Sequence, residues 1–276
     1  MSDNTTEITR RKFLATTGAA GALVSALETP SKANSPGEPP PSPSLSPSLS
    51  SSLSSSPSLS SSPSLSSSLL VPAMPTNVLG RTGSRVSRLA FGGSWNIDQE
   101  VIRRGMELGI NYIDTAQRYG QSETQFGETL SAIGAVGHSR ERKKLWLVTK
   151  THLHREIESM LPHSLERLKQ DYVDCYFLHQ LQDPHLASDP YLKSMAARLK
   201  KAGKTRFFGF SVHDDIVVES LNAAAESDFI DVVMFRYDCH YYKRDDLMRA
   251  IDNCTKKRIG LIAMKTQVGG MTLPDR

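Results

Sequence analysis

The chain has 276 residues, of which 38% are hydrophobic and 22% are charged, and its formal net charge is +4 from 33 basic and 29 acidic side chains. These charges are spread along the chain without an aromatic-bearing basic stripe, so the composition does not predict nucleic-acid binding. The cysteines, Cys175, Cys239 and Cys254, form no Cys-x-x-Cys pair. They indicate neither a disulfide framework nor an iron–sulphur or zinc site, and we expect no metal.

Residues 1–33 have the plan of a secretory signal peptide. Arg10 and Arg11 belong to a basic region, and an uncharged run of small and apolar residues follows at 15–27. This run is too short and too rich in Ala, Gly and Thr to predict a stable membrane span, and the small residues near Ala33 fit a cleavage site. The arginine pair resembles a twin-arginine signal, so we expect that export machinery to bind the precursor and the mature protein to be periplasmic or otherwise extracytoplasmic.

Residues 34–75 are expected to form a disordered linker. Their composition changes abruptly to Ser, Pro and Leu, and the unit Ser-Pro-Ser-Leu-Ser recurs. Isolated leucines among serines cannot bury enough apolar area to offset the chain entropy, and the prolines interrupt any continuous helix or strand. A functional spacer and a repeat expansion without a role both fit this stretch.

Residues 76–276 amount to about one domain, which is long enough to bury a sizeable core. Short apolar runs alternate there with helical patterns, which predicts an α/β fold with a parallel sheet, most simply a TIM-type barrel. A hairpin over 77–86 is expected to close the bottom of the barrel, and Pro162 is expected to kink or start a helix. The expected strands are 88–91, 111–114, 145–150, 174–179, 206–211, 231–237 and 260–265, with helices at 98–108, 122–133 and 214–226.

The stretch 109–127 carries two groups that can do proton chemistry. A short buried strand ends at Asp114, and Tyr119 follows in a polar loop. Ser122 and Gln125 then have the spacing of a capping box that opens a helix. Parallel α/β folds build their active sites on the loops that follow the carboxyl ends of the strands. Alone, however, the Asp would equally fit a turn and the Tyr a surface position.

Two further strand ends carry Lys150 and His179, each of which also has an ordinary structural interpretation by itself. On one face of a barrel these groups and the first two would converge in a single pocket. There Lys150 would lower the pKa of the Tyr119 phenol, and Asp114 would hold Lys150 charged and in place. His179 would donate a hydrogen bond to a substrate carbonyl, and Tyr119 would protonate its oxygen as a hydride reaches the carbon.

Short motifs stand at these strand ends and in the loops that follow them. Each motif is common by itself, and their order along the chain carries the information. They are Val78-Leu79-Gly80-Arg81-Thr82-Gly83, Phe91-Gly92-Gly93, Asn111-Tyr112-Ile113-Asp114-Thr115-Ala116, Tyr119-Gly120 with Ser122-Glu123, Val148-Thr149-Lys150, Asp171-Tyr172-Val173-Asp174, Leu178-His179 and Gly209-Phe210-Ser211.

This set of motifs resembles the aldo/keto reductase family over 78–270. The resemblance implies a (β/α)8 barrel, an NADP cofactor, with NAD as the alternative, held across its top without a Rossmann fingerprint, and a small aldehyde or ketone as substrate. It implies a catalytic set of Asp114, Tyr119, Lys150 and His179. It also implies cofactor contacts by Gly93, Ser94, Asp114, Ser211 and Arg236, and a substrate pocket lined by Trp95, Tyr119 and His179.

Several features depart from the family pattern. Val212 and His213 stand where many members carry Asn, and Arg236 stands where they carry Gln. The run 263–266 resembles a subgroup often fused to iron–sulphur modules. Because the sequence ends at Arg276, we expect an incomplete, C-terminally truncated barrel of about seven strands. An NADP-dependent carbonyl oxidoreductase and an inactive remnant or non-enzymatic binding protein of the same fold therefore both remain open.

Overall fold

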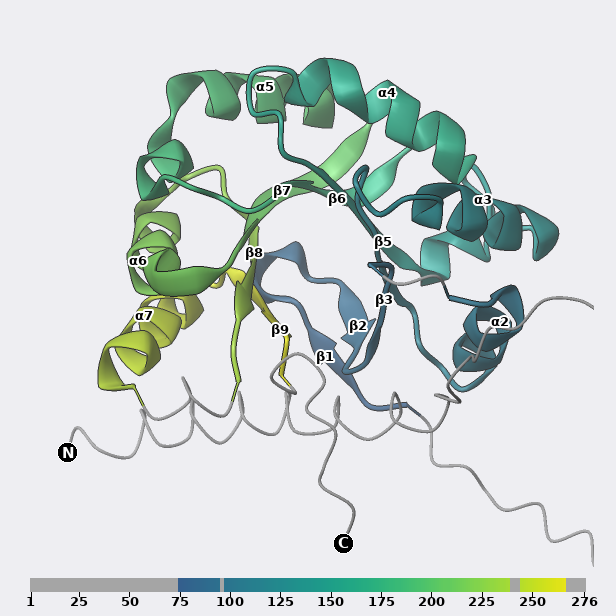
Figure 1. Ribbon diagram of the computed structural model, residues 1–276, viewed down its shortest axis with the longest axis horizontal. Helices are drawn as coiled ribbons and strands as arrows, with labels where there is room; N and C mark the ends of the chain where they lie inside the picture. The colour runs from purple at the N-terminus through teal and green to yellow at the C-terminus, as the bar shows by residue number, and fades with distance from the viewer. Residues whose placement is uncertain (1–73, 95–96, 239–243, 267–276) are drawn as a thin grey trace, which may run out of the picture. The chain divides into compact units, whose positions relative to one another are not determined.

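The computed structural model describes residues 74–94, 97–238 and 244–266 (Figure 1). These residues belong to one of the two units into which the chain divides, and the other unit, 24–72, lies outside them. The predicted signal peptide, nearly all of the predicted linker, Trp95 and Cys239 also lie outside the described residues.

One curled sheet of seven strands organises the described part of the chain (Figure 1). All neighbouring strands are parallel, and their order in the sheet is their order along the chain. This is a half-barrel with the winding of a (β/α)8 barrel, so the predicted fold class and all seven predicted strands are confirmed. The strands are β3 (Ala90–Gly92), β4 (Tyr112–Asp114), β5 (Trp146–Thr151), β6 (Val173–Leu178), β7 (Thr205–Val212), β8 (Val232–Arg236) and β9 (Gly260–Met264).

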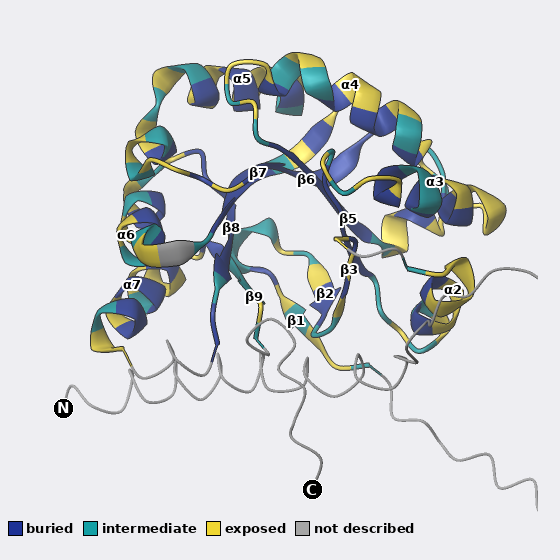
Figure 2. Ribbon diagram, viewed as in Figure 1, coloured by how far each residue is buried: buried dark blue, intermediate teal, exposed yellow. Residues whose placement is uncertain are grey.

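The helices lie on the convex side of the sheet, where Figure 1 shows them as an outer layer. Their inward residues are buried and their outward residues are exposed, as Figure 2 shows. No helix in the described ranges is long and apolar enough to cross a membrane. The helices are α2 (Gln99–Glu107), α3 (Ser122–Ala132), α4 (Ile157–Leu168), α5 (Pro190–Lys201), α6 (Val217–Glu226) and α7 (Asp245–Lys256), with 3-10 turns η1 (Gly80–Thr82), η2 (Arg142–Lys144), η3 (Pro184–Ser188) and η4 (Asp214–Ile216).

Two local predictions about the helices have different outcomes. Pro162 was expected to kink or start a helix, and it lies within α4, which excludes the second alternative. The capping box at the start of α3 is wrong, because Gln121 is the N-cap residue and makes no side-chain cap hydrogen bond. The Ser122 hydroxyl instead lies 2.8 Å from that of Thr115, which ties the start of α3 to the end of β4.

A hairpin closes the lower end of the sheet's interior, as predicted. β1 (Thr76–Val78) and β2 (Arg85–Ser87) pair antiparallel, and Leu79 between them packs into the inner core. The turn lies against the start of β9, since a Cβ on Gly80 would come within 2.3 Å of the backbone nitrogen of Gly260. Gly80 also has a φ of +50°, which favours glycine. The hairpin therefore fixes which end of the half-barrel stays free for a site.

Candidate active site

Side chains alternate between the two faces of each strand, and this decides which of them reach the interior of the half-barrel above the β1–β2 hairpin. On β5, Trp146 and Val148 belong to the inner core, whereas Leu147 packs outward against the helices. Because successive residues of a strand point to opposite faces, Lys150 continues the inner row at the carboxyl end. Asp114 is the last residue of β4, and His179 directly follows β6.

Asp114 and Lys150 form a buried ion pair at these strand ends. The Lys150 Nζ lies 2.6 Å from Asp114 Oδ2 and also donates to the carbonyl oxygen of Thr115 at 2.8 Å. Lys150 is 1% exposed and Asp114 is 8% exposed. Burial lowers the pKa of Lys150 and raises that of Asp114, while the attraction between the two charges opposes both shifts. Each charge is therefore held in place by the other.

Tyr119 and His179 meet beside this ion pair. The Tyr119 hydroxyl lies 3.3 Å from His179 Nε2, and the two rings meet edge to face with centroids 5.3 Å apart. The Lys150 Nζ lies 5.0 Å from the centroid of the Tyr119 ring, within the range of a cation–π contact. The four residues predicted from three strand ends thus lie together in one cluster.

The pKa of Tyr119 differs from the expectation. Burial raises it well above its ordinary value, and the negative charge of Asp114 raises it further. The prediction that Lys150 lowers this pKa is therefore wrong for the chain alone. The ammonium of Lys150 is already paired with Asp114, so its field offsets only part of the cost of a partly desolvated phenolate. Tyr119 consequently holds its proton at every physiological pH.

His179 has the opposite shift. Burial, followed by the nearby charge of Lys150, lowers its pKa to about 2, so the imidazole is neutral. The ring of His152 stacks on that of His179, with centroids 4.2 Å apart. His152 was not predicted from the sequence. It lies two residues after Lys150, so the period of two along a strand was a signal that both side chains point to the same face. This stack restricts the orientation of the His179 ring.

The proposed cofactor contacts lie at the same ends of other strands. Gly93 is buried and donates from its backbone nitrogen to the Asp114 carbonyl oxygen at 2.7 Å, and Ser94 beside it is exposed. Ser211 on β7 is 1% exposed, and its hydroxyl accepts from the backbone nitrogen of Gln180 at 3.0 Å. Gly93 therefore contacts the cluster and Ser211 lies beside it, whereas Arg236 ends β8, two strands beyond β6.

Arg236 carries a positive charge at the rim of this site. Its Nε donates to Asp238 Oδ2 at 2.7 Å, and its side chain keeps 28% of its surface exposed. The Asp238 carboxylate holds the Nε edge of the guanidinium. The ion pair with Asp238 therefore fixes a positive charge at the carboxyl end of β8.

Two buried polar atoms of the cluster residues fit a polar ligand. Asp114 Oδ1 and His179 Nδ1 have no hydrogen-bond partner among the described residues. Buried polar atoms are generally satisfied, so each of these atoms fits a group supplied from outside the chain. In the part of the chain that the structure covers, no group of three or more His, Cys, Asp or Glu side chains could hold a metal ion. Cys175 and Cys254 are both free and buried.

Comparison with known proteins places the chain in a family. The model of the aldo/keto reductase family matches residues 96–275. The chain belongs to the aldo/keto reductase family. The chain is 29% identical to L-galactose dehydrogenase from Arabidopsis thaliana over 220 residues, which cover 70% of this chain and 65% of that protein. It is 28% identical to methylglyoxal reductase DkgB from Salmonella typhi over 150 residues, which cover 51% of this chain and 54% of that protein.

Solved aldo-keto reductases share the fold. The holo form of aldo-keto reductase AKR11C1 from Bacillus halodurans superimposes with a TM-score of 0.55 at 25% identity, covering 73% of this chain and 71% of that one. The thermostable aldo-keto reductase Tm1743 gives a TM-score of 0.54 at 24% identity, covering 69% of this chain and 72% of that one. The chain spans about two thirds of the length of L-galactose dehydrogenase and about half of that of methylglyoxal reductase DkgB.

Proposed function

We propose that this aldo/keto reductase uses NADPH to reduce a small aldehyde or ketone, with Tyr119 as the proton donor. The observation that carries the proposal is the convergence of the Tyr119 hydroxyl with His179 Nε2, 3.3 Å away, above a buried Lys150–Asp114 pair. A phenol, a neutral imidazole and a fixed ammonium at the carboxyl ends of three neighbouring strands are the groups that protonation of a carbonyl oxygen needs.

The bound dinucleotide would supply the hydride. Gly93, Ser94, Ser211 and Arg236 would hold it along the strand ends. Asp114 Oδ1, which is buried without a partner among the described residues, is an acceptor suited to a sugar hydroxyl. The positive charge of Arg236 favours a phosphate-rich ligand.

His179 and Tyr119 would bind the carbonyl oxygen together. In the tautomer that carries hydrogen on Nε2, His179 donates to that oxygen and keeps it within reach of Tyr119. As negative charge develops on the oxygen it becomes more basic than a phenolate, so Tyr119 gives up its proton despite a raised pKa. The phenolate that remains is stabilised by the ammonium of Lys150.

The location of the protein is a separate proposal. We infer from Arg10, Arg11 and the uncharged run after them that a twin-arginine route exports the folded precursor. The mature reductase would then act outside the cytoplasm.

Oxidation of NADPH by the purified chain, measured by absorbance with a panel of small aldehydes and ketones, tests the proposed reaction. Binding of NADPH is measured in parallel by calorimetry, with NADH as the comparison. We expect oxidation that requires a carbonyl compound and that Lys150→Met abolishes, whereas the exposed Lys256→Met on α7 leaves it unchanged. A chain that neither binds nor oxidises NADPH would instead support an inactive remnant. Binding without any oxidation would support a non-enzymatic binding protein.

A further inference from the structure

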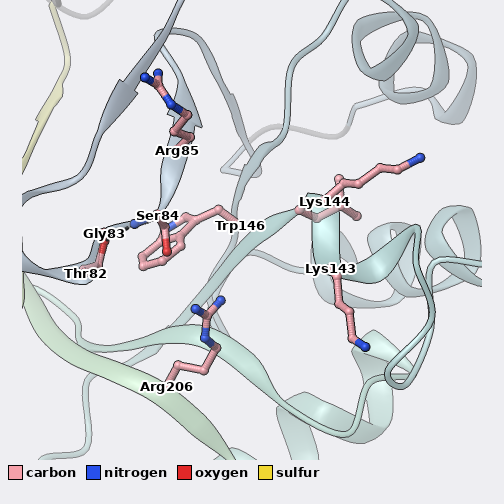
Figure 3. Close-up of a pocket in the computed structure, with 9 residues that line it drawn as sticks. Thr82, Gly83, Ser84, Arg85, Lys143, Lys144, Trp146 and Arg206 are labelled. Carbon is pink, nitrogen blue, oxygen red and sulfur yellow. Dashed lines mark hydrogen bonds between the residues drawn. The ribbon is translucent and has the colours of Figure 1, made fainter.

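A cavity of about 410 Å³ lies at the opposite end of the strands from the candidate active site (Figure 3). It is bounded by the turn of the hairpin, the 3-10 turn η2, the start of β5 and the start of β7. Trp146 lines this cavity, and Lys150 lies four residues further along the same strand, roughly 13 Å away at the usual rise per residue. The cavity is therefore separate from the reductive site.

Basic side chains dominate the lining. Arg85, Lys143, Lys144 and Arg206 all line the cavity, and no carboxylate does so. Figure 3 shows Arg206 pointing toward Ser84 and Trp146, whereas the ends of Lys143, Lys144 and Arg85 point away from these two residues. The volume falls within the range of small-molecule sites, which is roughly 300 to 1,000 Å³.

Carboxylates balance only part of this charge. Lys144 pairs with Glu141 at 2.7 Å, and Arg206 pairs with Asp174 at 2.7 Å. Asp174 already binds the fully buried Arg142 at 2.8 Å, so one carboxylate serves two guanidinium groups. In the described ranges neither Lys143 nor Arg85 forms an ion pair. A net positive charge therefore remains around the cavity.

Arg206 is the part of this lining that the fold holds in position. Its Nη1 donates to Asp174 Oδ1, and its guanidinium carbon lies 5.4 Å from the centroid of the Phe207 ring. These contacts fix one edge of the guanidinium. Its Nη2 makes no hydrogen bond to the described residues and can donate to a ligand in the cavity. A guanidinium placed in this way suits the tetrahedral oxygens of a phosphate group.

We propose that this cavity binds a small anion that carries two or more phosphate groups. Arg206 and the Ser84 hydroxyl would bind one phosphate inside the cavity, and the exposed Lys143 would bind another. Several cations spread around one opening favour a polyvalent anion, because a single negative charge would neutralise only a small part of the local field.

Titration of the full chain with inorganic tripolyphosphate, followed by calorimetry, tests the proposal. We expect saturable binding that Lys143→Gln weakens about threefold to fivefold, since an exposed charge pair is worth up to about 1 kcal/mol. Arg206→Gln should weaken it by about tenfold. The matched control is Lys256→Gln, which removes an exposed lysine of α7 that does not line the cavity and should leave the affinity unchanged.

Two further measurements place the bound anion. In a Trp95→Phe background Trp146 is the remaining tryptophan, and tripolyphosphate should change its fluorescence with the same dissociation constant. Saturating NADPH should leave that constant unchanged, because the cofactor would bind at the other end of the strands. Lack of saturable binding, equal affinity in Lys143→Gln and Lys256→Gln, or displacement by NADPH would each overturn the proposal. If Arg206→Gln fails to fold because Asp174 loses a partner, the comparison of Lys143→Gln with Lys256→Gln still tests the proposal.

Discussion

Replacement of His179 by Gln should make the folded protein less sensitive to acid. Burial lowers the pKa of His179 to about 2 in the folded chain, whereas an unfolded chain would bind a proton near the ordinary value of about 6.5. A group whose folded pKa is depressed in this way takes up its proton only on unfolding, so acid favours the unfolded state. The contribution of His179 to stability is therefore present above about pH 6.5 and is lost as the pH falls.

The size of the effect follows from proton linkage. On acidification from about pH 7 to about pH 5, one such histidine lowers the free energy of unfolding by about 2 kcal/mol. Any folded-state pKa below about 4 gives nearly the same decrease. Gln keeps a polar side chain of similar length that does not titrate. It should lower stability at both pH values by loss of the Tyr119 and His152 contacts, and it should remove this part of the pH dependence.

Urea unfolding of wild type and His179→Gln at the two pH values measures the difference. Wild type should lose about 2 kcal/mol more than the variant on acidification. The exposed His185 provides the matched control, because its replacement by Gln should leave the wild-type acid loss intact. An equal loss in wild type and His179→Gln would refute the claim that His179 is buried in its neutral form.

Three other predictions concern the core, the catalytic pH range and export. Arg142→Met should lower the free energy of unfolding by about 3 kcal/mol in urea titrations, because it removes the buried partner of Asp174, 2.8 Å away; a loss no larger than that of an exposed arginine would contradict it. The raised pKa of Tyr119 predicts a carbonyl reduction rate that is constant from about pH 6 to about pH 9, and an alkaline loss of rate within that range would count against it. Changing Arg10 and Arg11 to Lys should leave the precursor in the cytoplasm in cell fractionation, whereas normal export of the double variant would exclude the twin-arginine route.

Much of the fold could be predicted from the sequence because the strands are short, apolar and separated by helical patterns. The predicted strands 111–114, 145–150 and 174–179 each end on a polar residue, namely Asp114, Lys150 and His179. In a parallel sheet those ends lie on one edge, so the convergence of the three side chains followed from topology alone. Tyr119 was predicted to join the cluster because it lies in the short loop that follows Asp114.

The electrostatics of the site could not be predicted in the same way. The sign of the Tyr119 pKa shift depends on how far the phenol is desolvated and on whether Lys150 is already paired, and neither is visible in a residue pattern. The same holds for Ser122, whose hydroxyl bonds Thr115 across the loop instead of capping its own helix. The His152 stack depends on the path of the chain beyond β5, and the spacing from Lys150 was the only signal for it.

A single-turnover comparison of wild type and Tyr119→Phe, with the dissociation constant of NADPH measured beside it, tests the central claim most directly. The substitution keeps the ring, its contact with His179 and its packing, and it removes only the hydroxyl that lies 3.3 Å from Nε2. General acid catalysis of this kind is worth about two to four orders of magnitude in rate. We therefore predict a loss of that size in the rate of carbonyl reduction, with an unchanged dissociation constant for NADPH. A variant that reduces the carbonyl compound as fast as wild type would contradict the assignment of Tyr119 as the proton donor.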